Sequence, residues 1–133
     1  MKSIFLAMAL IATGVHAAEE SDNNPCDAVE NDVQTLECSV YGRTNAEDLL
    51  KENVQSLNDR LQTTYGKNKA QLTDISEKLK VAQQQWLKTR DADCAVEAFP
   101  ATSGSQAFTI AQNDCIARMS DERSEFLESI SQE

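Results

Sequence analysis

The side chains of this chain that could do chemistry are mainly carboxylates standing in close pairs. Asp91 and Asp93 form one pair, and Asp121, Glu122 and Glu125 form a second group. Carboxylates that lie close together on a helix can share a proton or a cation, which is the starting point of glycosidase-like or calcium chemistry. The acidic stretches lack the spacing of a calcium-binding loop, and an acidic chain contains such pairs by chance. We therefore interpret these carboxylates as solvated helix surfaces and expect no metal site.

The histidine content limits the chemistry further. The single histidine, His16, lies in an N-terminal segment that we expect to be removed on export. Without histidine, catalysis by serine or cysteine with a histidine base is excluded, and so are most transition-metal sites. No glycine-rich phosphate-binding loop is visible in the sequence. The sequence therefore predicts a protein that is not an enzyme and that has no cofactor.

The N-terminal segment has the three parts of a secretory signal peptide. Lys2 precedes an apolar run over residues 4–11, and small residues then lead to an acidic stretch. We expect cleavage after Ala17, with Ala18 as the alternative, and export to the periplasm or the medium. The apolar run is too short for a permanent membrane helix, and no later stretch is continuously apolar. The sequence thus predicts no stable membrane insertion.

The length and charge of the expected mature chain indicate one acidic domain. Removal of residues 1–17 leaves 116 residues, which is a normal length for a single domain over residues 18–133. The whole chain has 22 acidic and 12 basic residues, and loss of Lys2 changes the formal net charge from −10 to −11. Such a surface repels nucleic acid and anionic lipid and attracts cationic partners. Exported proteins are also often acidic for solubility alone.

The only tryptophan, Trp86, lies in the stretch with the most informative spacing. Gln83, Trp86 and Arg90 are three and four positions apart, so a helix places them on one stripe with Leu79 and Ile75. We expect the indole to be buried. A guanidinium beside it could recognise a carboxylate or a sugar. We prefer a structural role, in which the Arg90 stem covers Trp86 and its head group binds backbone carbonyls or an acid of the last helix.

Apolar residues that recur every three or four positions predict three long helices. Their expected ranges are residues 44–66, 72–94 and 105–130. Thr44 and Glu47 form a capping box for the first helix, and Ser105 is the expected N-cap of the third. No alternating β-pattern of useful length is present. The predicted fold class is all-α, a small helical bundle of three long helices plus a short disulfide-tied N-terminal helical segment.

That N-terminal segment is predicted to contain two short helices. Asn24 and Pro25 are a good N-cap and first-turn pair for one of them. Asn31, with Gln34 three positions later, resembles a capping box and predicts a break followed by a second short helix.

The four cysteines all lie in the expected mature chain. An even number in a small exported domain predicts two disulfides, and four cysteines allow three pairings. The cysteines are Cys26, Cys38, Cys94 and Cys115.

A set of residues along the helical stretches resembles the motifs of the LprI-like family, a group of small exported helical domains named after a lysozyme inhibitor. The residues that carry the resemblance are Leu57, Asn58, Tyr65, Gln83, Trp86, Arg90, Asp91, Arg118 and Arg123, with Gly104, Ser105, Cys115 and Leu127. Most members have no assigned function, so the resemblance implies the fold more strongly than the activity.

The resemblance, together with the local stretch that each pair encloses, favours bonds between Cys26 and Cys38 and between Cys94 and Cys115. A disulfide tolerates a Cα separation of at most about 7 Å, whereas twelve residues of continuous helix span roughly 18 Å. The chain must therefore turn between Cys26 and Cys38.

The resemblance also implies a partner. It suggests a cationic muramidase such as lysozyme, and the alternative is another envelope protein bound without inhibition. Acids would have to meet a basic cleft, and the loop from Glu97 to Ser105 and the surface around Asp121, Glu122 and Glu125 are the predicted contact regions.

Overall fold

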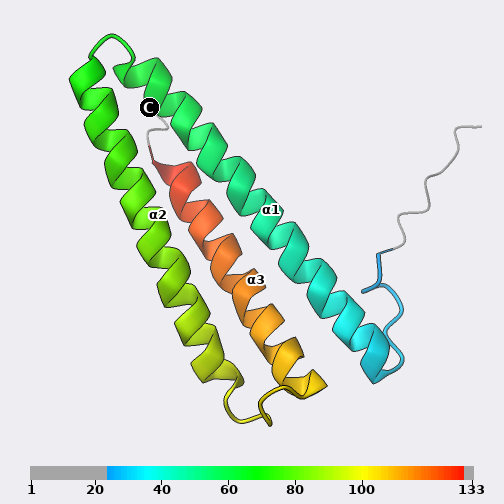
Figure 1. Ribbon diagram of the computed structural model, residues 1–133. Coiled ribbons are helices and arrows are strands. Elements are labelled where there is room, and N and C mark those ends of the chain that lie inside the picture. Colours follow the sequence, from blue (N-terminus) through cyan, green and yellow to red (C-terminus); the bar gives the residue numbers. More distant parts are fainter. Residues whose placement is uncertain (1–23, 131–133) are drawn as a thin grey trace, which may run out of the picture.

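The computed structural model describes residues 24–130 and contains three helices, as Figure 1 shows. They are α1 (Asp32–Tyr65), α2 (Lys69–Ala98) and α3 (Gln106–Ser129). The all-α fold class is confirmed. The expected signal peptide, residues 1–17, lies outside the described residues.

Each helix begins with a polar side chain that binds a free backbone N–H of the first turn. Asn31 accepts from the Gln34 N–H, Asn68 from the Gln71 N–H and Ser105 from the Phe108 N–H. These bonds satisfy donors that have no partner within the helix. The starts at Asn31 and Ser105 were predicted from sequence, whereas α2 begins three residues earlier and extends one turn further than expected.

The predicted break before Thr44 is wrong, because α1 is one continuous helix. The Thr44 hydroxyl donates to the Val40 carbonyl, as it does in a helix interior, and Glu47 binds Arg43 instead of capping. A glycine inside a helix costs only about 1 kcal/mol, so Gly42 is not enough to end it. Packing along the whole length of α1 outweighs that cost.

The N-terminal segment forms a turn rather than the predicted short helix. Residues 25–28 make the turn, and the Asn24 side chain accepts from the Cys26 N–H. The Cys26–Cys38 disulfide then fixes this turn against α1 with a Cα separation of 4.8 Å. The required reversal of the chain therefore occurs before Asn31, and the helix predicted to be short continues to Tyr65.

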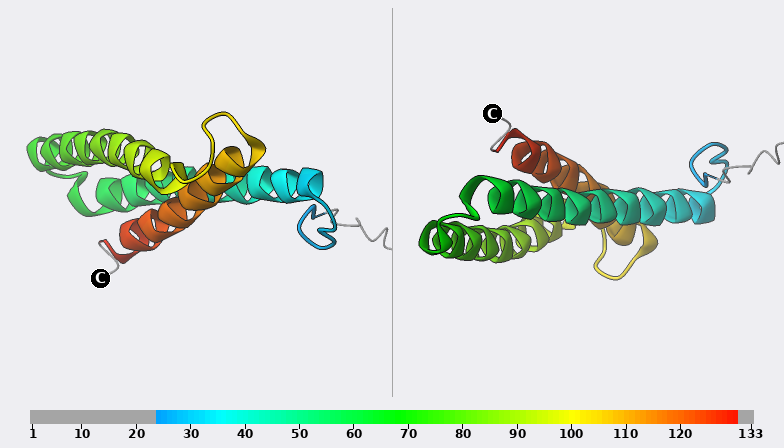
Figure 2. Two further views of the ribbon diagram at one scale, coloured as in Figure 1. Left: turned by 90° about the horizontal axis from the view of Figure 1, so that it is seen from below. Right: turned by 90° about the horizontal axis from the view of Figure 1, so that it is seen from above.

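The third helix runs parallel to α1 and antiparallel to α2. Gln106 binds the backbone of Asp32, and Arg60 binds the Leu127 carbonyl at the other end, so α1 and α3 stay together along their length. Figure 2 shows α3 lying obliquely across α1. Helix α3 makes most of its contacts with α1 and fewer with α2, while α1 and α2 touch each other least.

The interface between α1 and α3 is built largely from small and polar side chains. Its buried members include Ser39, Ala46 and Asn53 of α1 and Asn113, Ser120 and Ser124 of α3. Small side chains let two helices approach closely. Asn113 donates to the Ser39 hydroxyl at 3.1 Å and accepts from Arg43 at 3.2 Å. Toward the C-terminal ends of α1 and α3 the core consists of leucines, and Leu50, Leu57, Leu61 and Leu127 form one buried cluster there.

Candidate functional site

The two disulfides have the pairing predicted from sequence, and no cysteine is free. Cys94 and Cys115 join the end of α2 to the middle of α3 with a Cα separation of 5.5 Å, and both are buried. Cysteine chemistry is thus absent from the surface of the oxidised protein. The second disulfide also holds the connection between α2 and α3 firmly at its base.

Arg90 is buried, as the preferred structural interpretation expects, but its carboxylate partners come from α1 and α2 and not from the last helix, which contributes a hydroxyl. Its side chain is 5% exposed and donates to Glu47 at 2.9 Å, to the Ser120 hydroxyl at 3.3 Å and to Asp91 at 2.7 Å. Glu47 comes from α1, Ser120 from α3 and Arg90 from α2. One guanidinium therefore connects all three helices, and its charge is balanced by two carboxylates.

Trp86 lies between two arginines and is half-buried, not fully buried as expected. The Arg90 guanidinium lies 5.5 Å from the indole centroid and the Arg123 guanidinium 5.6 Å from it. Arg123 also lies 5.0 Å from the Phe126 ring centroid and donates to the Gln83 side chain at 3.1 Å. The structure thus brings together the sequence-predicted residues Gln83, Trp86, Arg90 and Arg123 in a row of stacked cations and rings. Burial lowers the pKa of Arg123.

Three further motif residues lie on α1. Leu57 is 1% exposed in the core, Tyr65 packs against the same cluster, and Asn58 is exposed and donates to the Val54 carbonyl. Arg60 was missed from sequence. It donates to the Leu127 and Ile130 carbonyls and so caps the negative end of α3. Its role depends on where α3 ends in space, which no local pattern reveals.

The acids proposed as partner contacts differ in their surroundings. Arg118 donates to Glu97 at 2.7 Å and to Glu122 at 3.2 Å, so these two carboxylates are already paired. The hydrogen bond to Glu122 and the charge of Glu97 raise the pKa of Arg118. Asp121 and Glu125 are exposed and form no ion pair within residues 24–130.

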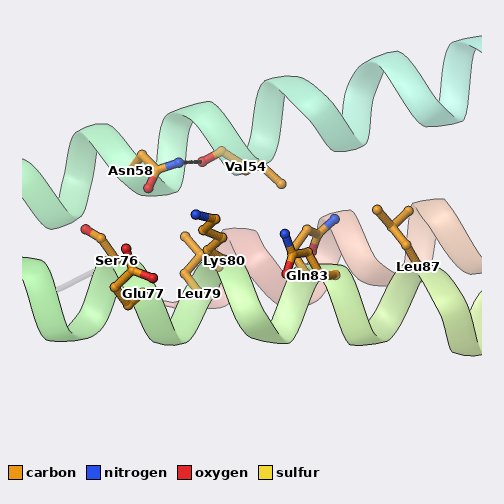
Figure 3. A pocket seen from close by; sticks show the side chains of 9 residues that line it. Val54, Asn58, Ser76, Glu77, Leu79, Lys80, Gln83 and Leu87 are labelled. Carbon is orange, nitrogen blue, oxygen red and sulfur yellow. Dashed lines mark hydrogen bonds between the residues drawn. The ribbon is translucent and has the colours of Figure 1, made fainter.

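Two adjoining cavities form a long open channel between α1 and α2, which we call the α1–α2 groove. Their volumes are about 430 and 340 Å³, and Val54, Gln83 and Leu87 line both. Figure 3 shows Val54 and Asn58 of α1 opposite side chains of α2, with α3 behind them. The rim carries both charge signs and amides: Glu47, Lys51, Gln55, Asn58, Glu77, Lys80 and Gln84. An apolar floor with a mixed polar rim is suited to contact with a protein segment.

With both disulfides formed, residues 24–130 have the features of neither a metal-binding nor a membrane-spanning structure. No group of three or more histidine, cysteine, aspartate or glutamate side chains is placed to hold a metal ion. None of the three helices combines the length and apolar character needed to cross a membrane.

These features define a class of protein: a small, disulfide-linked bundle of three helices with a stacked Trp and Arg centre. The family model described as "Lysozyme inhibitor LprI" matches residues 26–127, and the chain belongs to this family. A crystal structure of a DUF1311 family protein from Pseudomonas putida is 35% identical, with a TM-score of 0.70 over 80% of this chain and 99% of that one. Comparison with curated proteins gives no match.

Proposed function

We propose that this protein is an exported binding protein without catalytic activity, and that its partner is a cationic cell-wall hydrolase such as lysozyme. Membership of the family described as "Lysozyme inhibitor LprI" carries the proposal. The net charge of −10 supports it, because an acidic surface attracts a basic enzyme and raises its association rate. The two disulfides are consistent with an oxidising compartment.

The connection between α2 and α3 is the surface best built for such a contact. Phe99 at the start of the connection is 80% exposed, and Val96 in the last turn of α2 is 73% exposed, the largest values among the large apolar side chains described. The base of this connection is rigid, because Cys94 is bonded to Cys115 and Ala98 is buried. An exposed aromatic residue on a rigid support can enter a partner's cleft with little loss of conformational entropy.

Acids on neighbouring turns would complement a basic partner. Asp93 precedes Val96 by three positions on α2 and is exposed, and Asp121 lies one turn after Arg118 on α3. Both carboxylates form no ion pair within the described part of the chain, unlike Glu97. Asp93 and Asp121 are therefore better candidates for electrostatic contact than Glu97.

The experiment is a binding and inhibition assay of the mature protein with lysozyme at low and physiological salt. Binding should weaken as the screening length falls to about 8 Å near physiological strength. Cytochrome c serves as a basic protein without muramidase activity. Binding to lysozyme alone, with slower cell-wall lysis, supports the proposal. Equal binding to both proteins, with full lysozyme activity at saturation, contradicts it.

A matched pair of variants locates the contact. Phe99→Ala combined with Val96→Ala should weaken lysozyme binding by about tenfold or more, since central aromatic anchors carry much of the energy of an interface. Val81→Ala removes a side chain that is 53% exposed on the middle of α2 and should leave binding unchanged. Asp121→Lys should reduce mainly the association rate. A Glu97→Lys variant is less informative, because it also places a cation against Arg118.

The second candidate function is an envelope interaction module without inhibitory activity. The α1–α2 groove favours it, because its apolar floor and mixed rim suit a protein segment better than one strongly basic surface. Retention of an envelope protein by the unmodified chain, together with loss of that retention in Leu87→Glu, would support this function. Leu87 is 36% exposed on the groove floor, so the change should leave the core intact.

A further inference from the structure

Three sulfur atoms meet where the end of α2 packs against the middle of α3. The Met119 sulfur lies 3.6 Å from the Cys94 sulfur and 3.9 Å from the Cys115 sulfur. Met119 follows Cys115 by one turn of α3, so both side chains lie on one face of that helix and reach Cys94 of α2. Met119 is the only methionine after the expected signal peptide. We call Cys94, Cys115 and Met119 the sulfur cluster.

The two cysteines of this cluster are shielded from water, and a cation lies beside them. Cys94 is 0% exposed and Cys115 is 1% exposed, with Ile116 buried next to them. Met119 is half-buried and packs against the pair, so an incoming ion would meet its thioether first. One Nη nitrogen of Arg118 lies 3.8 Å from the Cys115 sulfur. The cluster thus combines a thioether near the surface, two cysteines behind it and a positive charge at its edge.

The spacing of the three sulfur atoms suits a trigonal site for one soft metal ion. With a metal–sulfur bond of about 2.3 Å, the length found for zinc thiolates, the sulfurs of a trigonal site lie about 4 Å apart. The distances from Met119 to the two cysteine sulfurs are already close to this value. The cysteine sulfurs have to move apart, which requires that the disulfide is absent. Thiolate and thioether ligands select soft ions such as Cu(I).

We propose that the sulfur cluster binds one Cu(I) ion while Cys94 and Cys115 are thiols, and that formation of their disulfide closes the site. Both residues are thiols when the chain is synthesised, so the site precedes the disulfide. No group of three histidine, cysteine, aspartate or glutamate side chains in residues 24–130 offers an alternative site. The proposal does not depend on lysozyme binding.

The binding step exchanges two protons for the ion and transfers no electrons. Two S–H bonds break, two protons leave, and Cu(I) forms bonds to both thiolates and to the Met119 thioether. Two thiolates and one monovalent cation leave one net negative charge, which the guanidinium of Arg118 offsets. Starting from the disulfide, a dithiol reductant supplies two electrons and two protons and is itself oxidised to a disulfide. The oxidised protein, by contrast, offers no thiolate to the ion.

A silver titration followed by NMR tests the proposal, because Ag(I) shares the preference of Cu(I) for sulfur and keeps its oxidation state. The mature protein with Cys26→Ser and Cys38→Ser retains only the cysteine pair of the cluster, and its single methionine is labelled with ¹³C in the methyl group. One equivalent of Ag(I) should shift the Met119 methyl resonance after reduction with a phosphine and leave it unchanged in the oxidised protein. Ag(I) binding without that shift, or the same shift in the oxidised protein, would overturn the proposal.

Two volume-conserving variants of the reduced protein separate ligation by the thioether from packing around it. Met119→Leu removes the third sulfur and should weaken Ag(I) binding about tenfold, a factor that corresponds to about 1.4 kcal/mol. Ile116→Leu changes a buried neighbour that has no sulfur and should leave the affinity unchanged. Equal affinities of Met119→Leu and the parent protein would refute the three-sulfur site. Circular dichroism checks each reduced protein, and loss of its helices on reduction would also refute the site, because the cluster would then not persist.

Discussion

The α1–α3 interface and the α1–α2 groove show how differently two contacts of the same helix can be built. Toward α3, helix α1 presents small buried side chains such as Ser39 and Ala46, and the two helices touch along their length. Toward α2 it presents Lys51, Gln55 and Asn58, and a channel remains between the helices. The comparison indicates that side-chain size along α1 decides which neighbour packs closely and which stays apart.

Polar groups inside the close interface are mostly, but not completely, satisfied. Asn113 binds Ser39 and Arg43, whereas the Asn53 amide nitrogen and the Ser124 hydroxyl are buried without a partner in the described chain. An unpaired buried polar group costs about 1 to 3 kcal/mol. The close approach of α1 and α3 therefore depends on the buried leucine cluster toward their C-terminal ends as well as on small side chains.

The largest expected difference between the two contacts is the loss of stability when a leucine in each is replaced by alanine. Leu57 is 1% exposed and Leu87, in the groove, is 36% exposed. Leu57→Ala should lower the free energy of unfolding by about 3 kcal/mol, because it leaves a buried cavity. Leu87→Ala should lower it by less than about 1 kcal/mol. Urea denaturation of both variants measures the difference, and similar losses would show that the groove is closed in solution.

The two disulfides should also differ in how much each one contributes to the free energy of unfolding. The bond between Cys94 and Cys115 spans 21 residues and ties α2 to α3, so its replacement by alanines should cost about 3 kcal/mol by the chain-entropy estimate. Replacement of Cys26 and Cys38 should cost at least about 1 kcal/mol less, because the freed turn can leave the folded helix and regain its entropy there. Chemical denaturation of the two double variants checks the order. Equal costs would mean that the N-terminal turn packs more firmly than its exposure indicates.

Gly42 tests whether a missing side chain helps α1 approach α3. An added Cβ at Gly42 would meet no atom within 4 Å, so Gly42→Ala should stabilise the protein by about 0.5 to 1 kcal/mol through helix propensity. Gly104→Ala is the contrasting variant, because Gly104 has φ of 78° and alanine there should cost about 1 kcal/mol. Thermal unfolding of both variants is the measurement. Destabilisation by Gly42→Ala would show that the interface is closer than described.

The smallest expected effect concerns Asp114, next to the buried Cys115. Partial burial raises the pKa of Asp114, although the residue stays largely exposed. The charged carboxylate is therefore less favourable in the folded state than in the unfolded state, and the penalty is present above the folded pKa and absent below the unfolded pKa. Asp114→Asn should stabilise the protein by less than about 0.5 kcal/mol at neutral pH and by nothing near pH 3. Urea titrations at the two pH values test the sign. Destabilisation at neutral pH would indicate that the carboxylate has a favourable partner.

Local sequence signals predicted the starts of α1 and α3 well, and they failed where long-range packing competes with them. Asn31 and Ser105 cap helices because a side-chain oxygen can reach the first free N–H groups, which is a local property. Thr44 has the same local chemistry but lies inside α1. The continuous contact of α1 with α3 favours the helical conformation there, and no neighbour in sequence reports that contact.

At the candidate site, too, local spacing could be read from the sequence and contacts between helices could not. The spacing of Gln83, Trp86 and Arg90 predicted one helical stripe, and the structural role preferred for Arg90 agrees with its burial between Glu47 and Ser120. The pair of Arg118 with Glu122, one turn apart on α3, can be read from sequence spacing, but sequence could not reveal that Arg118 also pairs with Glu97 of α2. It also could not reveal that Phe99 is exposed, because its exposure depends on how the end of α2 and the following connection lie against the bundle.

The sequence by itself determined three amphipathic helices, their family motifs and an acidic surface, because periodicity, capping and charge are properties of neighbouring residues. Only the tertiary structure decided that α3 packs on α1 and leaves a groove between α1 and α2, and that Arg123 lies over the rings of Trp86 and Phe126 without a carboxylate partner in the described chain. These outcomes depend on the relative lengths and crossing of helices, which arise from the competition of many weak contacts between distant residues.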